Sequence, residues 1–220
     1  MISKLPKWVE YGSFLLALVA GFINAVGLLG FSHQSVSHLS GTATLLGSGV
    51  ISSSFSSSFH LALILFSFLL GSMISGYFIN HNSLNLGPNY SRLLALEAAI
   101  IFAATYLLSQ GLPSGDYLAS AACGLQNALV TTYSGAIIRT THVTGIFTDL
   151  GIMLGAKLRG GIFDKRKAVL FLLIIIGFIV GGFFGAYFFS ILKFNALIIP
   201  ALICLLLAAM AWGYGKKIRI

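Results

Sequence analysis

Charged side chains are scarce in this chain. Asp, Glu, Lys and Arg make up only 8% of its 220 residues, whereas 57% of the residues are hydrophobic and the mean hydropathy is +0.96. Soluble domains carry roughly a quarter charged residues. The scarcity excludes an ordinary soluble domain and indicates an integral membrane protein.

Cysteine is also scarce, and it offers no covalent or metal framework. Cys123 and Cys204 both fall inside apolar runs, where we expect small buried residues. His38 and His142 lack a histidine four residues away and a Cys or carboxylate in a ligand pattern. We therefore expect no metal and no cofactor. The sequence also lacks a nucleophile with its base and a phosphate-binding loop, so we expect no enzymatic activity.

Long apolar runs are abundant. A helix needs roughly 20 residues to cross a hydrocarbon core of about 30 Å. Lipid offers backbone groups no partners, so such runs are expected to be helices. Residues 1–220 are therefore expected to form a single all-α membrane domain. The runs lie near 12–31, 60–79, 93–110, 117–138, 168–189 and 194–214.

The net charge is +8, and the positions of the basic residues argue against nucleic acid as a partner. Basic residues precede the first run, cluster within 157–167 and close the chain. These are positions flanking the spans, as the positive-inside rule requires. The pattern predicts a multi-pass protein of the bacterial inner membrane, in contact with the lipid bilayer, with both termini in the cytoplasm.

Similar segments recur about a hundred residues apart, in the same order. They predict two tandem repeats, near 12–110 and 117–214. The matches are HLSGTATLLG (38–47) with HVTGIFTDLG (142–151), GFINAVGLLGF (21–31) with GLQNALVTTYSG (124–135), and Gly71 and Gly76 with Gly177 and Gly182.

Two shorter segments, 40–55 and 143–157, leave the number of membrane helices between six and eight. If they enter the membrane only partly, each repeat crosses three times and the two repeats are inverted. If they cross fully, the repeats are parallel. We favour the inverted 3+3 arrangement with a short partial helix in each half. Secondary transporters often use this plan, with the substrate site where the repeats meet.

The two partial helices begin with polar residues. Ser40 and Thr144 stand before Gly41 and Gly145, which is the composition of a helix N-cap. The unpaired N–H groups of such a start attract an anion or a polar oxygen, and Thr42 follows in the first turn. The alternative is that both are ordinary capped helices at the membrane surface.

Ionisable residues inside a membrane are costly and are functional candidates. Asp149 lies four residues after Gly145, on the same helical face. Arg139 and His142 precede this helix and are expected near Asp149 or a substrate carboxylate. A structural pair between Asp149 and Arg139 remains the alternative.

Other polar residues complete the candidate substrate site. His38 occupies the place of His142 in the first repeat and can act in proton sensing or as a structural interfacial residue. Asn24, Gln126 and Asn127 place carboxamides within the first and fourth runs, where they hold neighbouring helices together or bind a substrate.

These motifs resemble those of the YoaK family of bacterial membrane proteins, a group of unknown function. The resemblance covers nearly the whole chain and rests on AGFINAVGLLGF, SHLSGTATLLG, ACGLQNALV and TTHVTGIFTDLG. The family pattern carries an acidic residue in place of Asn24 and Thr-Gly-Asn in place of Ser40, Gly41 and Thr42. The resemblance implies the membrane fold but no settled activity.

We predict a small secondary transporter or permease whose substrate, a small polar or anionic solute, binds between the repeats. A passive channel is the first alternative. The second is a non-transporting membrane scaffold or interaction protein whose glycine-rich faces form homo-oligomers.

Overall fold

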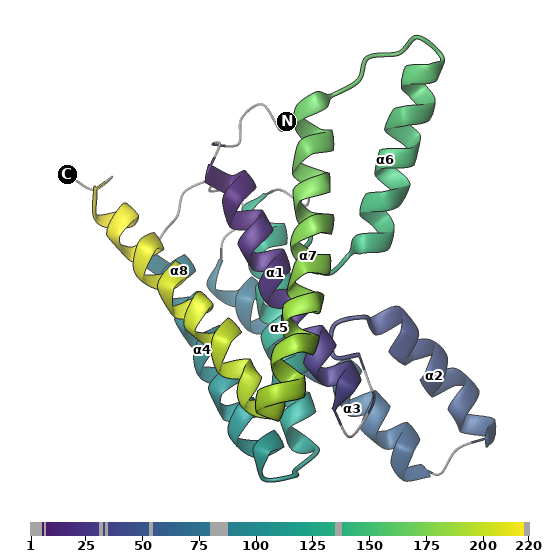
Figure 1. Cartoon of the computed structure of the whole chain (residues 1–220), viewed down its shortest axis with the longest axis vertical. Coiled ribbons are helices and arrows are strands. Elements are labelled where there is room, and N and C mark those ends of the chain that lie inside the picture. Colours follow the sequence, from purple (N-terminus) through teal and green to yellow (C-terminus); the bar gives the residue numbers. More distant parts are fainter. Residues whose placement is uncertain are drawn as a thin grey trace.

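A computed structural model describes residues 6, 8–30, 33, 35–52, 55–79, 88–134 and 138–217. Within these ranges all regular structure is helical and there is no strand, which confirms the all-α prediction. The helices are α1 (Trp8–Leu29), α2 (Leu39–Ser52), α3 (Phe55–Phe78), α4 (Pro88–Ser109), α5 (Ser114–Tyr133), α6 (Val143–Leu158), α7 (Lys165–Leu192), the short 3-10 helix η2 (Lys193–Leu197) and α8 (Ile198–Lys217) (Figure 1).

Among the described residues, four helical stretches are long and apolar enough to cross a membrane. Three of them coincide with α1, α3 and α4, and the fourth covers 50 residues from Lys165 to Tyr214. That length is more than twice what one crossing needs, and η2 divides it into α7 and α8, which run in opposite directions (Figure 1).

The predicted run at 117–138 differs from the others. It forms α5, which ends at Tyr133 and is not among the four apolar stretches. The reason is its buried polar content, which includes Asp116, Ser120 and Gln126. These side chains face neighbouring helices instead of lipid, because α5 packs against both α3 and α4.

The predicted partial helices are α2 and α6, with 14 and 16 residues. At 1.5 Å per residue each is about 21 to 24 Å long, which is shorter than the hydrocarbon core. Both helices project from the same side of the bundle. From there α2 extends towards one end and α6 towards the other (Figure 1).

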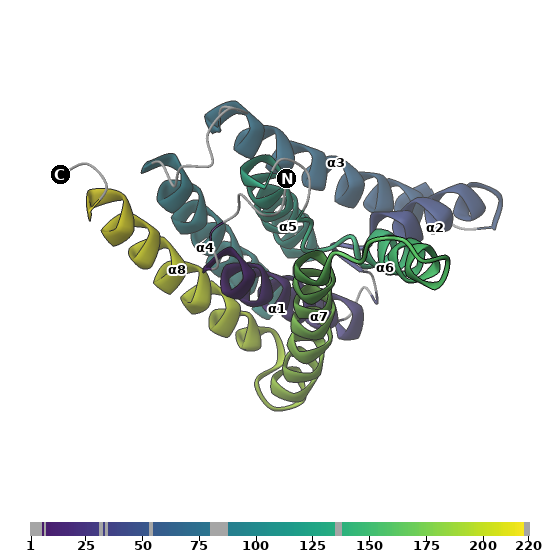
Figure 2. The same cartoon turned by 90° about the horizontal axis from the view of Figure 1, so that it is seen from above.

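Helix pairs that are distant in sequence form the bundle. α1 packs along α7, α3 along α5, and α4 along α8 (Figure 2). Glycines allow the closest approaches, since a Cβ at Gly21 would overlap the Phe178 carbonyl, and one at Gly181 the Leu18 carbonyl. Small residues at such crossings let helices in lipid gain van der Waals contact.

The pair α3 and α5 meets in the same manner. A Cβ at Gly71 would overlap the Ala121 carbonyl, and one at Gly124 the Phe68 carbonyl. Two hydroxyl groups add polar contacts between these helices: Ser72 Oγ donates to the Gly124 carbonyl at 3.0 Å, and Ser120 Oγ donates to the Ile64 carbonyl at 2.9 Å.

Acidic residues secure both ends of the bundle. At the end of the N-terminus, Arg166 Nε donates to Glu10 Oε1 at 2.9 Å, which ties α7 to α1. Asp164 caps α7 by accepting from the Lys167 N–H at 3.0 Å. Near the start of α5, His60 Nε2 lies 3.7 Å from Asp116 Oδ2.

We predict that Gly181→Ala lowers the apparent melting temperature of the purified protein, whereas Gly182→Ala does not. The new methyl group at Gly181 meets the Leu18 carbonyl, while at Gly182 the nearest atom lies 3.9 Å away. Overpacking of this kind costs about 1 to 3 kcal/mol. Both substitutions favour helix equally, so the comparison isolates the steric effect. Equal melting temperatures would contradict the close α1–α7 contact.

Candidate functional site

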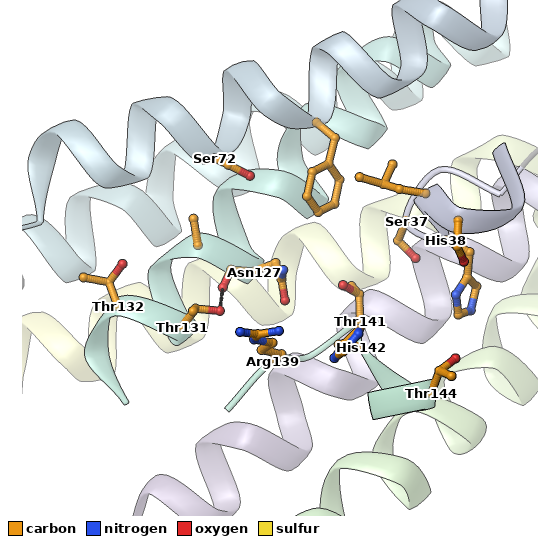
Figure 3. Close-up of a pocket in the computed structure, with 14 residues that line it drawn as sticks. Ser37, His38, Ser72, Asn127, Thr131, Thr132, Arg139, Thr141, His142 and Thr144 are labelled. Atoms are coloured by element: carbon orange, nitrogen blue, oxygen red, sulfur yellow. Dashed lines mark hydrogen bonds between the residues drawn. The ribbon is translucent and has the colours of Figure 1, made fainter. Parts of the chain in front are cut away.

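The starts of α2 and α6 meet at a cavity of about 540 Å³ beside α3 and α5. Figure 3 shows its polar side chains converging from these elements. The cavity is lined by Ser37, His38, Leu39, Ser40, Phe68, Ser72, Asn127, Ala128, Thr131, Thr132, Arg139, Thr141, His142 and Thr144.

Asn24 shapes the segment that leads into α2. Its Oδ1 atom accepts hydrogen bonds from Ser35 Oγ at 2.6 Å, Ser37 Oγ at 2.8 Å and the Ser37 N–H at 3.3 Å. Ser35 Oγ in turn accepts from the His38 N–H at 2.9 Å. Asn24 is buried behind the cavity wall, so it positions the start of α2 and does not line the cavity.

Gln126 has the corresponding structural role near α6. Its Nε2 atom donates to the Leu16 carbonyl at 2.7 Å and to Thr140 Oγ1 at 3.3 Å. The carboxamide thus joins α5 to α1 and to the segment that precedes α6. Gln126 is fully buried and, like Asn24, is absent from the lining.

The predicted N-caps are each wrong by two positions. Thr144 lies inside α6, whose N-cap is His142, and Ser40 lies inside α2, where the His38 carbonyl accepts the first helical hydrogen bonds. The Ser40 and Thr144 carbonyls instead accept from Thr44 and Thr148, one turn later. The side chain of His142, the N-cap residue of α6, makes no capping hydrogen bond to the N–H groups of the first turn.

The two histidines stand at these helix starts. The His38 ring packs edge-on against Phe178 with ring centroids 5.5 Å apart, and burial lowers the pKa of His38 below its usual 6.5, which favours the neutral ring. The His142 ring lies over Gly145, where a Cβ would overlap it. Glycine at 145 is therefore required for this ring position.

Thr42 and Gly41, the remaining residues of the first-repeat motif, do not line the cavity. Thr42 is buried, and its Oγ1 donates to the carbonyls of Ser35 at 3.3 Å and His38 at 3.4 Å. Gly41 is exposed, with nothing within 4 Å of an added Cβ. Thr42 thus holds the turn, and Gly41 leaves space beside it.

The lining is positive and rich in hydroxyl groups. It contains Arg139 but no Asp or Glu, and among the described residues Arg139 makes no ion pair. Asn127 Oδ1 is buried without a hydrogen-bond partner in the described part of the chain. The two helix starts, the hydroxyl groups and the Arg139 guanidinium suit a ligand with negatively charged oxygens.

Asp149 lies outside this lining. It is exposed on α6, and the ion pair with Arg139 that the sequence suggested is not found among the described residues. A helical spacing of four residues placed Asp149 near Gly145, but it did not determine which way that face of α6 points.

Several lining residues were not predicted. Thr131 lies one turn after Asn127 on α5 and donates from Oγ1 to its carbonyl at 2.6 Å, so helical spacing could have identified it. Phe68 and Ser72 come from α3, and nothing in their local sequence distinguishes them from residues that only pack.

The comparison with protein families covers almost the entire bundle. A family model described as "Protein of unknown function (DUF1275)" matches residues 12–210. The chain belongs to this family. The DUF1275 match agrees with the expected family of unknown function, although it does not confirm the YoaK name. Neither a curated protein nor a solved structure matches the chain.

We predict that Asn24→Leu destabilises this DUF1275 protein, whereas Asn24→Asp does not. Leucine leaves the Ser37 N–H and two hydroxyl groups without their acceptor, at a cost of about 1 to 3 kcal/mol per unsatisfied buried group. Aspartate keeps an acceptor oxygen in the same place. The apparent melting temperature in detergent measures both effects, and a wild-type value for Asn24→Leu would contradict the role of Asn24.

Proposed function

We propose that this DUF1275 protein is a secondary transporter of a small polar anion in the bacterial inner membrane. The observation that carries the proposal is Arg139, which makes no ion pair within the described ranges and lines a cavity to which no Asp or Glu contributes. The volume of about 540 Å³ falls in the range of about 300 to 1,000 Å³ common for small-molecule sites. The proposal includes no enzymatic step and no cofactor.

Arg139 would bind the negative charge of the solute, and the starts of α2 and α6 would orient its oxygen atoms. Asn127, His38 and His142 would supply further hydrogen bonds from three sides of the cavity. Asn24 and Gln126 would keep both helix starts in place. Asp149, which lies off the lining, has no role in this proposal.

The proposal includes two inverted repeats, α1–α4 and α5–α8. Matching contacts support them: Gly21 on α1 meets Phe178 on α7, and Gly124 on α5 meets Phe68 on α3. The opposite directions of α2 and α6 support them further (Figure 1). In such repeats the substrate site lies where the halves meet, and here both halves line one cavity.

The contacts favour a different register for the third pair of motifs. Gly71 meets the Ala121 carbonyl and Gly181 meets the Leu18 carbonyl. Leu18 and Ala121 precede the matched residues Gly21 and Gly124 by the same three positions. Gly71 is therefore better matched with Gly181 than with Gly177, which the sequence comparison selected.

Transport is tested with the purified full-length protein in liposomes and a panel of radiolabelled phosphate, sulfate and small carboxylates, with neutral sugars for comparison. We expect saturable uptake of at least one anion, reduced roughly 10- to 100-fold by Arg139→Gln, because a charge-assisted hydrogen bond contributes about 1.5 to 3 kcal/mol. Arg159→Gln, at the far end of α6 and outside the lining, is the matched control.

The other outcomes distinguish the alternatives. Uptake that rises linearly with anion concentration would indicate a passive channel. Absence of uptake across the whole panel would contradict transport and favour a membrane scaffold. Equal uptake by the Arg139 and Arg159 variants would remove Arg139 from the site.

The inverted arrangement predicts that Phe55→Cys and Ile162→Cys are labelled by a membrane-impermeant maleimide from opposite sides. Both positions are open, with Phe55 86% and Ile162 98% exposed, whereas the native Cys123 and Cys204 are buried. Labelling of Ile162→Cys from the cytoplasm would also place the start of α1 on that side, since Arg166 holds α7 beside it. Labelling of both cysteines from one side would contradict inversion.

A further inference from the structure

Glu97 is a fully buried carboxyl group inside the helix bundle. It lies on α4, with an exposed fraction of 0%, and neither oxygen accepts a hydrogen bond from a described nitrogen or oxygen donor. The titratable groups facing it are Cys204 on α8, whose thiol is within hydrogen-bonding reach, Cys123 on α5, and Tyr90 on α4 itself. Within the part of the chain that the structure describes, Glu97 thus has weak acids as neighbours and no cation beside it.

The other acidic residues differ from Glu97 in their surroundings. Glu10 and Asp116 are held by Arg166 and His60, Asp164 caps α7, and Asp149 is exposed. Arg92 does not neutralise Glu97, although both lie on α4. The two residues are five positions apart on different faces of the helix, with Arg92 exposed and Glu97 buried.

A second cavity, of about 350 Å³, lies at the end of the bundle that holds the N-terminus, and its lining reaches Leu94, one helical turn before Glu97. It lies between α1, α4 and α8, and its lining includes Gly12, Leu94 and Leu207. Leu94 precedes Glu97 by one helical turn, and Leu207 follows Cys204 by one turn. The Glu97–Cys204 layer therefore comes directly after this cavity along the facing sides of α4 and α8.

We propose that Glu97 is a proton-binding site, loaded and unloaded through the cavity between α1, α4 and α8, that couples solute movement to a proton gradient. The inference rests on the proposed transport function. A carboxylate buried without a partner is strongly disfavoured, so Glu97 holds its proton in the packed state. When the cavity between α1, α4 and α8 widens as far as Glu97 and water enters, the carboxylic acid releases one proton to water and becomes a carboxylate.

Helix α5 connects Glu97 with the solute cavity. Cys123 on α5 faces Glu97, and Asn127, one turn further along the same helix, lines the solute cavity. Gln126, between them, binds the Leu16 carbonyl of α1. A shift of α4 or α8 that exposes Glu97 would therefore move α5, which forms part of the solute site.

The first experiment needs no solute. Dicyclohexylcarbodiimide reacts with protonated carboxyl groups in apolar surroundings, and peptide mass spectrometry locates the product. In wild-type protein in liposomes we expect Glu97 to be the main labelled residue, with labelling that falls at least fivefold as the pH is raised towards alkaline values. Absence of the label on Glu97, or labelling that does not change with pH, would overturn the proposal.

The second experiment measures proton movement. Liposomes that contain a pH-sensitive dye receive the anion that gives the largest uptake in the panel. Wild-type protein and Glu10→Gln, a matched change of a carboxylate paired at the surface, should move protons with the anion. Glu97→Gln should abolish the dye response but retain anion exchange between the two sides. A wild-type dye response in Glu97→Gln would overturn the proposal.

The path is tested with two glycines that have open space for a side chain. Gly12→Leu narrows the cavity beside α4 and α8, whereas Gly76→Leu adds the same side chain at an exposed position of α3. We expect proton movement to slow at least fivefold only in Gly12→Leu, and equal rates would overturn the path. If no anion is taken up, the transport function and the coupling both fail, while carbodiimide labelling still decides whether Glu97 binds a proton.

Discussion

The structure depends on satisfying backbone groups where the chain is not helical inside an apolar environment. Lipid cannot supply hydrogen-bond partners, so the segments before α2 and α6 need partners within the protein. Asn24 accepts from the Ser37 N–H and hydroxyl in the first segment. In the second, Ser134 Oγ accepts from the Ile138 N–H at 2.8 Å, and Gln126 donates to the Thr140 hydroxyl. These two carboxamides allow two helix starts to lie beside one another, and the polar cavity exists because of that placement.

The sequence predicted the parts of the site that local motifs encode. Its two histidine motifs led to His38 and His142, which lie at one cavity, and a carboxamide with an arginine led to Asn127 and Arg139 in the same lining. It could not predict the contribution of α3, because Phe68 and Ser72 are ordinary residues of an apolar helix. The side of α3 that faces the cavity follows from its packing on α5, a contact between residues about 50 positions apart.

For the fold, too, the sequence predicted the features that local composition encodes and missed those that depend on packing. Hydropathy identified the apolar helices, because a membrane span has to be nearly uniform in composition. Composition alone marks α5 less clearly, since a helix enclosed by α3 and α4 can carry Asp116 and Gln126 without exposing them to lipid. The caps were misplaced because Ser40 and Thr144 have cap-forming side chains, while the backbone turn begins two residues earlier, at His38 and His142.

The bundle is not packed equally in its two halves, and this bears on how a transporter of this design would work. α5 packs along α4, with Gly115 against the Ala104 carbonyl, whereas α1 contacts α8 only slightly and the second cavity lies between them. If α1–α4 and α5–α8 are inverted repeats, the α4–α5 contact is equivalent to the α8–α1 contact. In this structure the α4–α5 contact is closed and the α8–α1 contact is open. Exchanging them would close the cavity at the end of the N-terminus and open its counterpart at the other end, which is alternating access. The carboxyl of Glu97 lies in α4 and next to α8, so both openings would border the same proton site.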